Sequence, residues 1–383
     1  MEKTILRGIT WAHSRGITPL LASSQRFNEL HPNIDIRWEK RTLQDFADFP
    51  LEALAEKFDL LIIDHPWVGT AAKKECILPL DNYLPSAFLK EQREQSVGSS
   101  YTSYEYADHL WALAIDAAAP AASFRADLFH RANRTPPANW EELINLAKEG
   151  KVAIPGIPVD TILHFLMFCL ATGEEPFQNK RQAISLEKGK LALQCMHELW
   201  SLCDKEIFGL NPIALAEKMS SSDKYWYCPF AFCYSNYSRE GFAEKQLTYT
   251  DLLRFTPETK LRSVLGGTGL AISAVATNRD ACLEFAQWIT SPVIQRTIYG
   301  EHGGQPGHRS AWTSPRLNTL TDNYFINALP AVSNAYVRPR YHGFLYFQDH
   351  AGEMIWRYLL NGGNETVVIE QLNALYVESL TVV

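Results

Sequence analysis

Three side chains that can bind a polar ligand follow a short apolar run, Leu60–Ile63. The run is too short for a helix and apolar at every position, so we expect a buried strand of a parallel sheet. Pro66 has no amide hydrogen to donate and ends the strand. In open α/β sheets, ligands bind beyond the carboxyl ends of the strands, where Asp64, His65 and Trp67 would lie.

The chemistry available at this strand end suits a hydroxyl-rich ligand. A carboxylate at Asp64 can accept hydrogen bonds from sugar hydroxyls, and Trp67 offers a flat apolar face to a ring. The structural alternative is that Asp64 caps the next turn while His65 packs on Pro66.

A second group of candidate ligand contacts follows the first expected strand, Ile5–Thr10, and begins with Trp11. His13, Ser14 and Arg15 stand at the start of an expected helix, where amide hydrogens and the positive end of the dipole favour anions. They could hold a carboxylate or sulfonate. Alternatively, they make loop-capping hydrogen bonds and leave Arg15 in solvent.

Asp116 is the one acid in an otherwise apolar, Ala-rich segment. An unpaired charge there would be costly, so a partner is expected. The partner is either a ligand or a basic side chain that bridges two lobes.

An aromatic run and a glycine-rich stretch are further candidates. Tyr225, Trp226 and Tyr227 could stack on a sugar ring, or belong to a core. Gly266 and Gly267 are not in a phosphate loop, because no Gly-Lys-Ser/Thr follows them. They form a hinge turn or add backbone donors to a cleft.

Late in the chain, a loop with several glycines carries Gln305, His308 and Arg309. These side chains either reach a ligand cleft or belong to a rigid structural loop. His342, between a tyrosine and a glycine, is a last candidate.

The elements around these residues indicate an α/β protein. Strand, helix, strand, a helix near residues 48–57 and the strand Leu60–Ile63 form the pattern of a doubly wound layer. A second α/β lobe starts after residue 120, with a capping-box helix start at residues 139–142 and a buried helix over 162–171.

The composition of the chain limits the kinds of molecule that it is expected to bind. The 383 residues suffice for two domains, and a net charge of −7 without a basic stripe argues against nucleic acid and anionic membranes. The longest apolar stretch falls short of the ~20 residues that a bilayer needs, so no membrane insertion is expected. We expect a monomer that binds a small molecule.

Seven cysteines, an odd number without a Cys-x-x-Cys spacing, suggest neither a zinc site nor a disulfide framework. No metal, cofactor or catalytic motif is expected. The first residues show no leader, and free buried thiols suit a reducing compartment, so the chain as written is expected in the cytoplasm. A removed leader would instead place it in the periplasm or at the cell surface.

The order of these pieces resembles the extracellular solute-binding proteins of ABC importers, in the sugar-binding group called family 1, with the periplasmic binding protein-like II fold. The resemblance rests on residues 10–11, 27–32, 59–64, 77–81, 113–116, 124–129, 139–143, 266–272, 291–292 and 304–306.

This resemblance implies two α/β lobes joined by hinge crossovers, with the ligand in the cleft between them. The expected lobes are 1–114 plus 265–312, and 115–264 plus 313–383. The leading hypothesis is a protein that captures a sugar or sugar acid for an ABC transporter permease. The alternative is a cytoplasmic enzyme on the same fold that uses His and Asp side chains for acid–base chemistry.

Overall fold

The computed structural model describes residues 3–42 and 50–382, and the chain divides into two compact units. Unit 1 consists of Met1–Ala118, Leu265–Leu329 and Arg340–His342, and unit 2 of the remaining segments, Ala119–Val264, Pro330–Pro339 and Gly343–Val383. The chain therefore crosses between the units after Ala118, Val264, Leu329, Pro339 and His342.

These units differ in three places from the lobes expected from the sequence, namely residues 115–118, 313–329 and 340–342, all of which belong to unit 1. Residues 115–118 stay with unit 1, because they belong to strand β6 (Leu113–Ala118), which pairs with β10 (Gly266–Ile272). Residues 313–329 also belong to unit 1, where Phe325 packs edge-on against Trp312, with ring centroids 5.2 Å apart.

Unit 1 is built on a mixed sheet of five strands in the order β2-β1-β3-β10-β6. β1 is parallel to β2 and β3, whereas β10 is antiparallel to β3 and β6. The other strands of unit 1 are β1 (Thr4–Trp11), β2 (Ile34–Arg41), β3 (Leu60–Ile63), β4 (Glu105–Tyr106) and β5 (His109–Leu110). Its α-helices are α1 (Ser14–Leu30), α3 (Leu51–Ala55), α4 (Val68–Lys74), α5 (Ser86–Glu94), α11 (Arg279–Ile289), α12 (Pro292–Ile294), α13 (Arg309–Trp312), α14 (Pro315–Leu320) and α15 (Tyr324–Ser333), the last of which runs on into unit 2.

Short helical turns and one π-helix complete unit 1. They are η1 (His65–Trp67), η2 (Leu80–Asn82), η3 (Thr102–Tyr104) and the π-helix η6 (Gln295–Tyr299). The helix expected near 48–57 corresponds to α3, and its expected first residues, 48 and 49, lie outside the described part of the chain.

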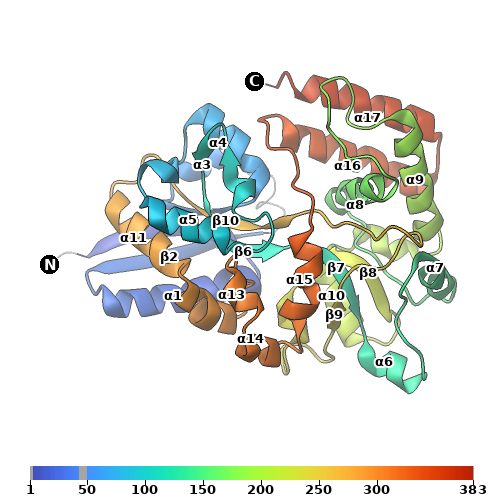
Figure 1. Ribbon diagram of the computed structural model, residues 1–383, viewed down its shortest axis with the longest axis horizontal. Helices are drawn as coiled ribbons and strands as arrows, with labels where there is room; N and C mark the ends of the chain where they lie inside the picture. The colour runs from blue at the N-terminus through green and yellow to red at the C-terminus, as the bar shows by residue number, and fades with distance from the viewer. Residues whose placement is uncertain (1–2, 43–49, 383) are drawn as a thin grey trace. The chain divides into compact units, whose positions relative to one another are not determined.

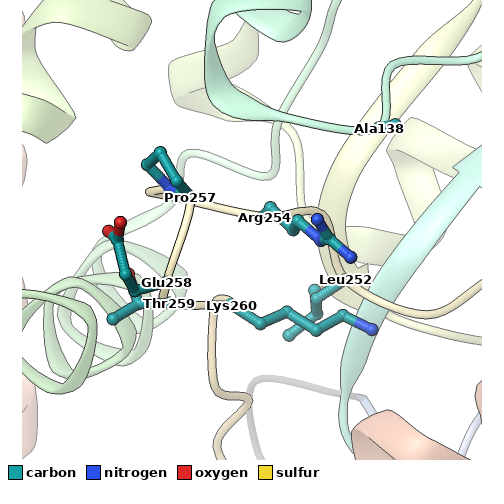
Figure 2. A pocket seen from close by; sticks show the side chains of 7 residues that line it. All are labelled: Ala138, Leu252, Arg254, Pro257, Glu258, Thr259 and Lys260. Carbon is teal, nitrogen blue, oxygen red and sulfur yellow. The ribbon is translucent and has the colours of Figure 1, made fainter.

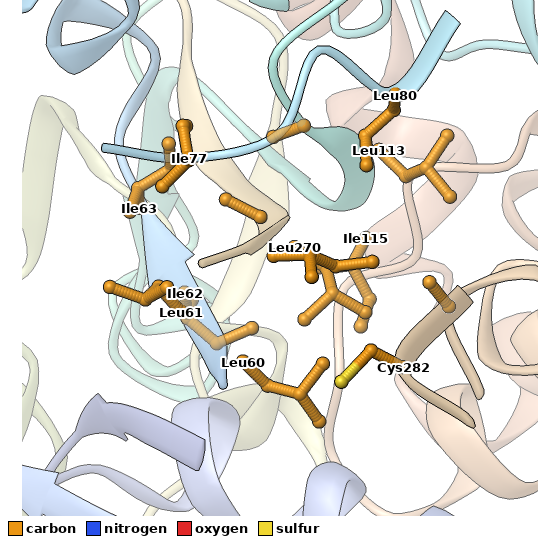
Figure 3. Packing of buried hydrophobic residues seen from close by; sticks show 14 of the residues in the cluster. Leu60, Leu61, Ile62, Ile63, Ile77, Leu80, Leu113, Ile115, Leu270 and Cys282 are labelled. Atoms are coloured by element: carbon orange, nitrogen blue, oxygen red, sulfur yellow. The ribbon is translucent and has the colours of Figure 1, made fainter. Parts of the chain in front are cut away.

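The core of unit 1 forms around β3. Each of its four side chains is buried, as a strand with neighbours on both sides and both faces covered requires. Figure 3 shows Leu60–Ile63 together with Leu270 of β10 and Cys282 of α11. Helix α1 joins this core through Phe27, whose ring lies 5.2 Å from that of Phe285 in α11.

Unit 2 combines a small antiparallel sheet with long helices. The sheet has the order β8-β7-β9, formed by β7 (Pro120–Phe124), β8 (Tyr227–Phe232) and β9 (Thr248–Thr250). Its helices are α6 (Ala126–Arg131), α7 (Trp140–Lys148), α8 (Pro158–Ala171), α9 (Leu186–Trp200), α10 (Pro212–Ser221), α16 (Phe344–Asn361) and α17 (Glu365–Ser379), with the 3-10 turns η4 (Lys205–Gly209) and η5 (Ser235–Ser238). Figure 1 shows α16 and α17, from the end of the chain, beside α8 and α9.

The α/β class predicted from the sequence is confirmed. None of the helices in the described residues is both long and apolar enough to span a bilayer. Within the same residues, no three His, Cys, Asp or Glu side chains gather in a way that could hold a metal ion.

Candidate functional site

The register of the unit 1 sheet brings most of the candidate residues to one edge. β1 and β3 are parallel and therefore end on the same side. β10 runs antiparallel to β3 and to β6, so its first residues lie beside the ends of those strands. The chain leaves unit 1 at the end of β6 and returns at the start of β10, and we call this edge the crossover edge of unit 1.

The start of α1 lies at this edge, directly after β1. His13 is the N-cap residue, and its Nδ1 accepts a hydrogen bond from the backbone N–H of Arg15 at 3.0 Å. Burial, helped by the nearby Arg15 guanidinium, lowers the pKa of His13 to about 4. His13 is therefore neutral at neutral pH. Ser14, the next residue, is partly buried, and Trp11 is buried against Gly16 of α1.

Arg15 does not extend into solvent but pairs with Asp116. Arg15 Nε donates to Asp116 Oδ2 at 3.0 Å, and Nη2 donates to Oδ1 at 2.5 Å, with both residues buried. Burial raises the pKa of Asp116, and the Arg15 guanidinium opposes that rise. The partner expected for Asp116 from the sequence is thus a basic side chain, Arg15, which belongs to the same unit.

The glycine-rich loop closes over this ion pair. The backbone N–H of Gln305 donates to Asp116 Oδ2 at 3.3 Å, and Gln305 Nε2 donates to the carbonyl of Ala117 at the same distance. Gln305 is 0% exposed, whereas Arg309 is exposed. The packing of this loop is therefore that of a rigid structural loop, which was the alternative to a loop that reaches a ligand.

His308 anchors the loop to α5. Its Nε2 lies 2.8 Å from Glu91 Oε1, while Nδ1 accepts from the backbone N–H of Ser310 at 3.2 Å. His308 is the N-cap residue of α13 and is buried. These bonds hold the loop in place from a second side.

Asp64, His65 and Trp67 follow β3 in the turn η1. Asp64 is its N-cap, and Oδ1 accepts from the backbone N–H of His65 at 2.8 Å. His65 is 0% exposed and meets Tyr104 edge-on, so its ring belongs to the core. The carboxylate of Asp64 and the indole of Trp67 remain partly exposed at the crossover edge.

Gly266 and Gly267 open β10 at the same edge and are partly exposed. Gly267 has a φ of +93°, and a Cβ there would lie 2.4 Å from the carbonyl oxygen of Asp116. Glycine is therefore required by both conformation and space. The next residue, Thr268, is buried, and its hydroxyl has no hydrogen-bond partner in the described protein.

His342 also reaches unit 1, although it comes from the last part of the chain. Its Nδ1 lies 3.0 Å from the hydroxyl of Thr70, in the first turns of α4. Because α4 directly follows η1, this contact places His342 near the crossover edge.

The aromatic run Tyr225–Tyr227 lies at the end of the unit 2 sheet away from the crossover. β7 enters unit 2 with Pro120 opposite Phe232, and its other end, Phe124, lies opposite Tyr227. Tyr227 and the adjacent Tyr225 are therefore at the far edge of the sheet, and each is 1% exposed.

Trp226, between them, is covered on one face by Lys151, whose Nζ lies 3.9 Å from the ring centroid. We therefore leave the run Tyr225–Tyr227 out of the proposed site. Its residues pack within unit 2, and this packing is the structural alternative that the sequence left open.

The equivalent edge of unit 2 carries residues that the sequence analysis missed. Phe232 ends β8 opposite Pro120, one residue after the chain enters unit 2, and its ring is partly exposed. Ser235 and Asn236 follow in η5, both buried, and Asn236 Oδ1 has no hydrogen-bond partner in the described protein. The signal was present, because a buried strand followed by polar residues is the pattern that singled out Asp64. We call this edge the crossover edge of unit 2.

A separate pocket of about 420 Å³ lies on unit 2 (Figure 2). Its lining belongs mostly to one hairpin loop and consists of Ala138, Leu252, Arg254, Pro257, Glu258, Thr259 and Lys260. Figure 2 shows the Arg254 and Lys260 side chains extending to the same side, but Lys260 pairs with Asp251. None of the residues expected to bind a ligand lines this pocket.

All seven cysteines are free. Burial raises the pKa of the Cys76 and Cys195 thiols to about 11 and of Cys203 and Cys282 to about 12. Because the thiolate is the reactive form, these protonated thiols are poor nucleophiles at neutral pH.

Two α/β units joined by crossovers, with polar residues gathered at the crossover edges, define the class of two-lobed binding proteins. A family model described as bacterial extracellular solute-binding protein matches residues 16–296. The match spans most of the sequence, and the chain belongs to this family. No curated protein matches it by sequence.

Solved structures share the fold over nearly the full length. MalE3 of T. maritima, solved with maltose, has a TM-score of 0.81 at 16% identity and covers 97% of this chain and 99% of its own. A solute-binding protein from Agrobacterium radiobacter K84, solved with ribitol, has a TM-score of 0.81 at 16% identity and covers 99% and 98%. One from Thermotoga lettingae TMO, bound to alpha-D-tagatose, has a TM-score of 0.80 at 17% identity and covers 98% and 100%. At these identities the likeness shows the fold.

Proposed function

We propose that this protein captures a neutral sugar or polyol and delivers it to the permease of an ABC importer. Membership of the solute-binding family supports the capture role. The ligands in the similar solved structures, namely maltose, ribitol and tagatose, are all uncharged and rich in hydroxyl groups.

The observation that carries the choice of a neutral ligand is the buried pair of Arg15 and Asp116. An anionic ligand such as a sugar acid needs an available cation. Arg15 already gives both its Nε and Nη2 donors to Asp116, and His13 is neutral at neutral pH. The start of α1 therefore supplies polar neutral groups and helix amides rather than positive charge.

Groups at the crossover edge of unit 1 support the proposal. Asp64 accepts hydrogen bonds from ligand hydroxyls, and Trp67 packs on the sugar ring. Unit 2, taken by itself, offers a partly exposed aromatic ring at Phe232 and a buried amide at Asn236. A wrong sugar would leave these polar groups unpaired, which is a strong basis for rejection.

In this proposal the protein works on the extracellular side of the membrane, as its family description implies, and it works there as a monomer. Its seven free thiols are compatible with that location, because most are buried or held protonated. We do not propose the enzyme alternative: of its candidate groups, Asp116 is held in an ion pair, His65 is buried in the core and His13 caps a helix.

The proposal is tested by calorimetric titration of neutral sugars, polyols and the matching sugar acids. We expect heat from a neutral compound and at least ~10-fold weaker binding of its acid. The variants Asp64→Asn and Trp67→Ala should weaken binding, whereas Trp226→Ala, at the far edge of unit 2, serves as the matched control and should not. Tight binding of the acid alone would overturn the proposal, as would equal losses in Trp67→Ala and Trp226→Ala.

A further inference from the structure

Three residues near the end of the chain belong to unit 1, although unit 2 precedes and follows them. The segment Arg340–His342 is assigned to unit 1, between Pro330–Pro339 and Gly343–Val383 of unit 2. A segment of three residues stays packed on unit 1 only if specific contacts hold it there, because each fixed residue loses conformational entropy.

Arg340 provides the first of these contacts. Its Nη1 group donates to the backbone carbonyls of Thr102 at 2.7 Å, Ser103 at 3.3 Å and Glu105 at 2.6 Å. All three acceptors lie in or beside η3 of unit 1. A charged donor shared by three carbonyls at the end of a 3-10 turn is a strong attachment, because hydrogen bonds to ionised groups exceed neutral ones in strength.

The second contact is made at Gly69, whose missing side chain lets the backbone of the segment pack against α4. A Cβ on Gly69 would lie 1.8 Å from the carbonyl oxygen of Arg340, so the backbone of the segment lies directly against α4. One residue further along α4, the Thr70 hydroxyl lies 3.0 Å from His342 Nδ1. The segment is thus attached at its first and last residues and pressed against α4 between them.

Unit 2 holds the chain immediately afterwards. A Cβ on Gly343 would lie 1.9 Å from the carbonyl oxygen of Ser379, at the end of α17. Just before the segment, Arg338 Nη1 donates to Gln348 Oε1 in α16 at 2.9 Å. His342, which contacts Thr70 of unit 1, and Gly343, which packs against Ser379 of unit 2, are adjacent in the chain. No flexible residue therefore separates the two contacts.

We propose that Arg340–His342 is a strap that ties the last part of unit 2 to α4 and η3 of unit 1 and limits how far the two units can move apart. The strap is released when its attachments to unit 1 are lost. Arg340 and Gly69 are positioning residues in this device, since neither is required to touch a ligand.

The first experiment measures release of the strap by limited trypsin digestion, because trypsin cleaves after arginine and needs a locally released chain. The variant Gly69→Ala keeps Arg340 but inserts a methyl group where the Arg340 carbonyl lies. We expect cleavage between Arg340 and Tyr341 to accelerate by ~10-fold or more. The matched control is Gly209→Ala, because a Cβ at Gly209 meets nothing within 4 Å.

The second experiment measures the consequence by small-angle X-ray scattering of the protein without ligand. Gly69→Ala and Arg340→Ala should increase the radius of gyration and the maximum dimension relative to wild type. Arg357→Ala is the control for the arginine variant, because the Arg357 side chain is 72% exposed and forms a surface pair with Glu353. Thr70→Val, which keeps the side-chain shape and loses only the hydroxyl, is a milder variant should either of the others fail to fold.

The two experiments distinguish between the ways in which the proposal could fail. Unchanged trypsin cleavage in Gly69→Ala would show that the attachment to α4 does not hold the segment. Faster cleavage with unchanged scattering would show that the segment is held but limits nothing. Either result overturns the strap, and neither depends on which ligand binds, so a failed sugar titration leaves this test intact.

Discussion

At the scale of single residues, the buried charges distinguish the site from the surface. Many ion pairs of this protein are exposed, such as Arg26 with Glu29, and contribute little to stability. The pair of Arg15 and Asp116 is different, because both side chains are at most 5% exposed. Removing one partner takes the paired charge away from a buried ionised group, which costs far more than the pair itself contributes.

The variant Asp116→Asn therefore should destabilise the protein by about 3–5 kcal/mol. Urea unfolding monitored by circular dichroism measures this loss. Glu29→Gln, which changes an exposed arginine pair, is the control and should cost less than about 1 kcal/mol. Similar losses in the two variants would mean that the Arg15 guanidinium finds other partners or water when Asp116 is neutral.

Helix α8 holds a second buried acid, Asp160, one turn before His164. Both are buried, and neither Asp160 Oδ2 nor His164 Nδ1 has a hydrogen-bond partner in the described protein. Burial raises the pKa of Asp160 to about 8 and lowers the pKa of His164 to about 3. Both groups are thus neutral in the folded protein at pH 7, as an apolar core requires.

These shifts predict a pH dependence with a definite sign. Below pH 8 the folded state holds the Asp160 proton more tightly than the unfolded state, so stability falls as pH rises towards 8. His164 has the opposite effect, but only below its ordinary pKa of 6.5. Between pH 6.5 and 8 the Asp160 contribution is therefore isolated from that of His164, and it amounts to at most about 2 kcal/mol.

Chemical unfolding across this range measures the effect as the difference between wild type and Asp160→Asn, which copies the protonated acid. We expect the wild type to lose stability relative to the variant as pH rises. Glu187→Gln, at a side chain 86% exposed, is the control and should leave the profile unchanged. Parallel profiles for wild type and Asp160→Asn would show that Asp160 is already ionised at pH 6.5.

At the scale of elements, local patterns were predicted well. The strand Leu60–Ile63 matches β3, and the expected buried helix over 162–171 lies within α8. The expected helix start at Asn139 is also confirmed, since its side chain accepts from the backbone N–H of Glu142 at 3.0 Å. Each of these features depends on neighbouring residues, which is why a single sequence reveals them.

Features that depend on distant residues were not predictable in the same way. Arg15 is 101 positions from Asp116, and no local pattern identifies it as the partner. The run Tyr225–Tyr227 has the composition of a ligand platform, but strand register places it at the far edge of its sheet and leaves Phe232 at the crossover edge. Register is set by the pairing of whole strands, so composition alone could not choose between the two ends.

The backbone geometry at the start of strand β10 can be tested directly. Gly267→Ala forces a side chain into a backbone with a φ of +93° and against the carbonyl of Asp116. We expect a loss of about 1–3 kcal/mol in thermal or urea unfolding, together with weaker ligand binding. Gly209→Ala has room for its methyl group and should behave like wild type. An equally stable Gly267→Ala would mean that β10 can shift its start without cost.

At the scale of the whole molecule, the charge of the protein and the charge of its ligand are linked. The chain carries a net charge of −7, which repels anions at a distance, and the guanidinium at the crossover edge of unit 1 is already engaged by Asp116. A protein arranged in this way is suited to ligands that carry no charge. Exposed charges are screened within about 10 Å at 0.1 M salt, so the argument can be tested through ionic strength.

We therefore expect the affinity for the proposed neutral sugar to change by less than about twofold between about 20 mM and 500 mM sodium chloride. A sugar acid held by an available cation would instead bind severalfold more weakly at high salt, because screening removes its Coulomb attraction. Calorimetric titrations at both salt concentrations measure this, and Asp116→Asn supplies a positive control. In that variant the Arg15 guanidinium no longer faces the Asp116 carboxylate, so affinity for the acid should appear at low salt and fall as salt is added. A steep salt dependence in the wild type would show that a cation other than Arg15 takes part in binding and would return sugar acids to consideration.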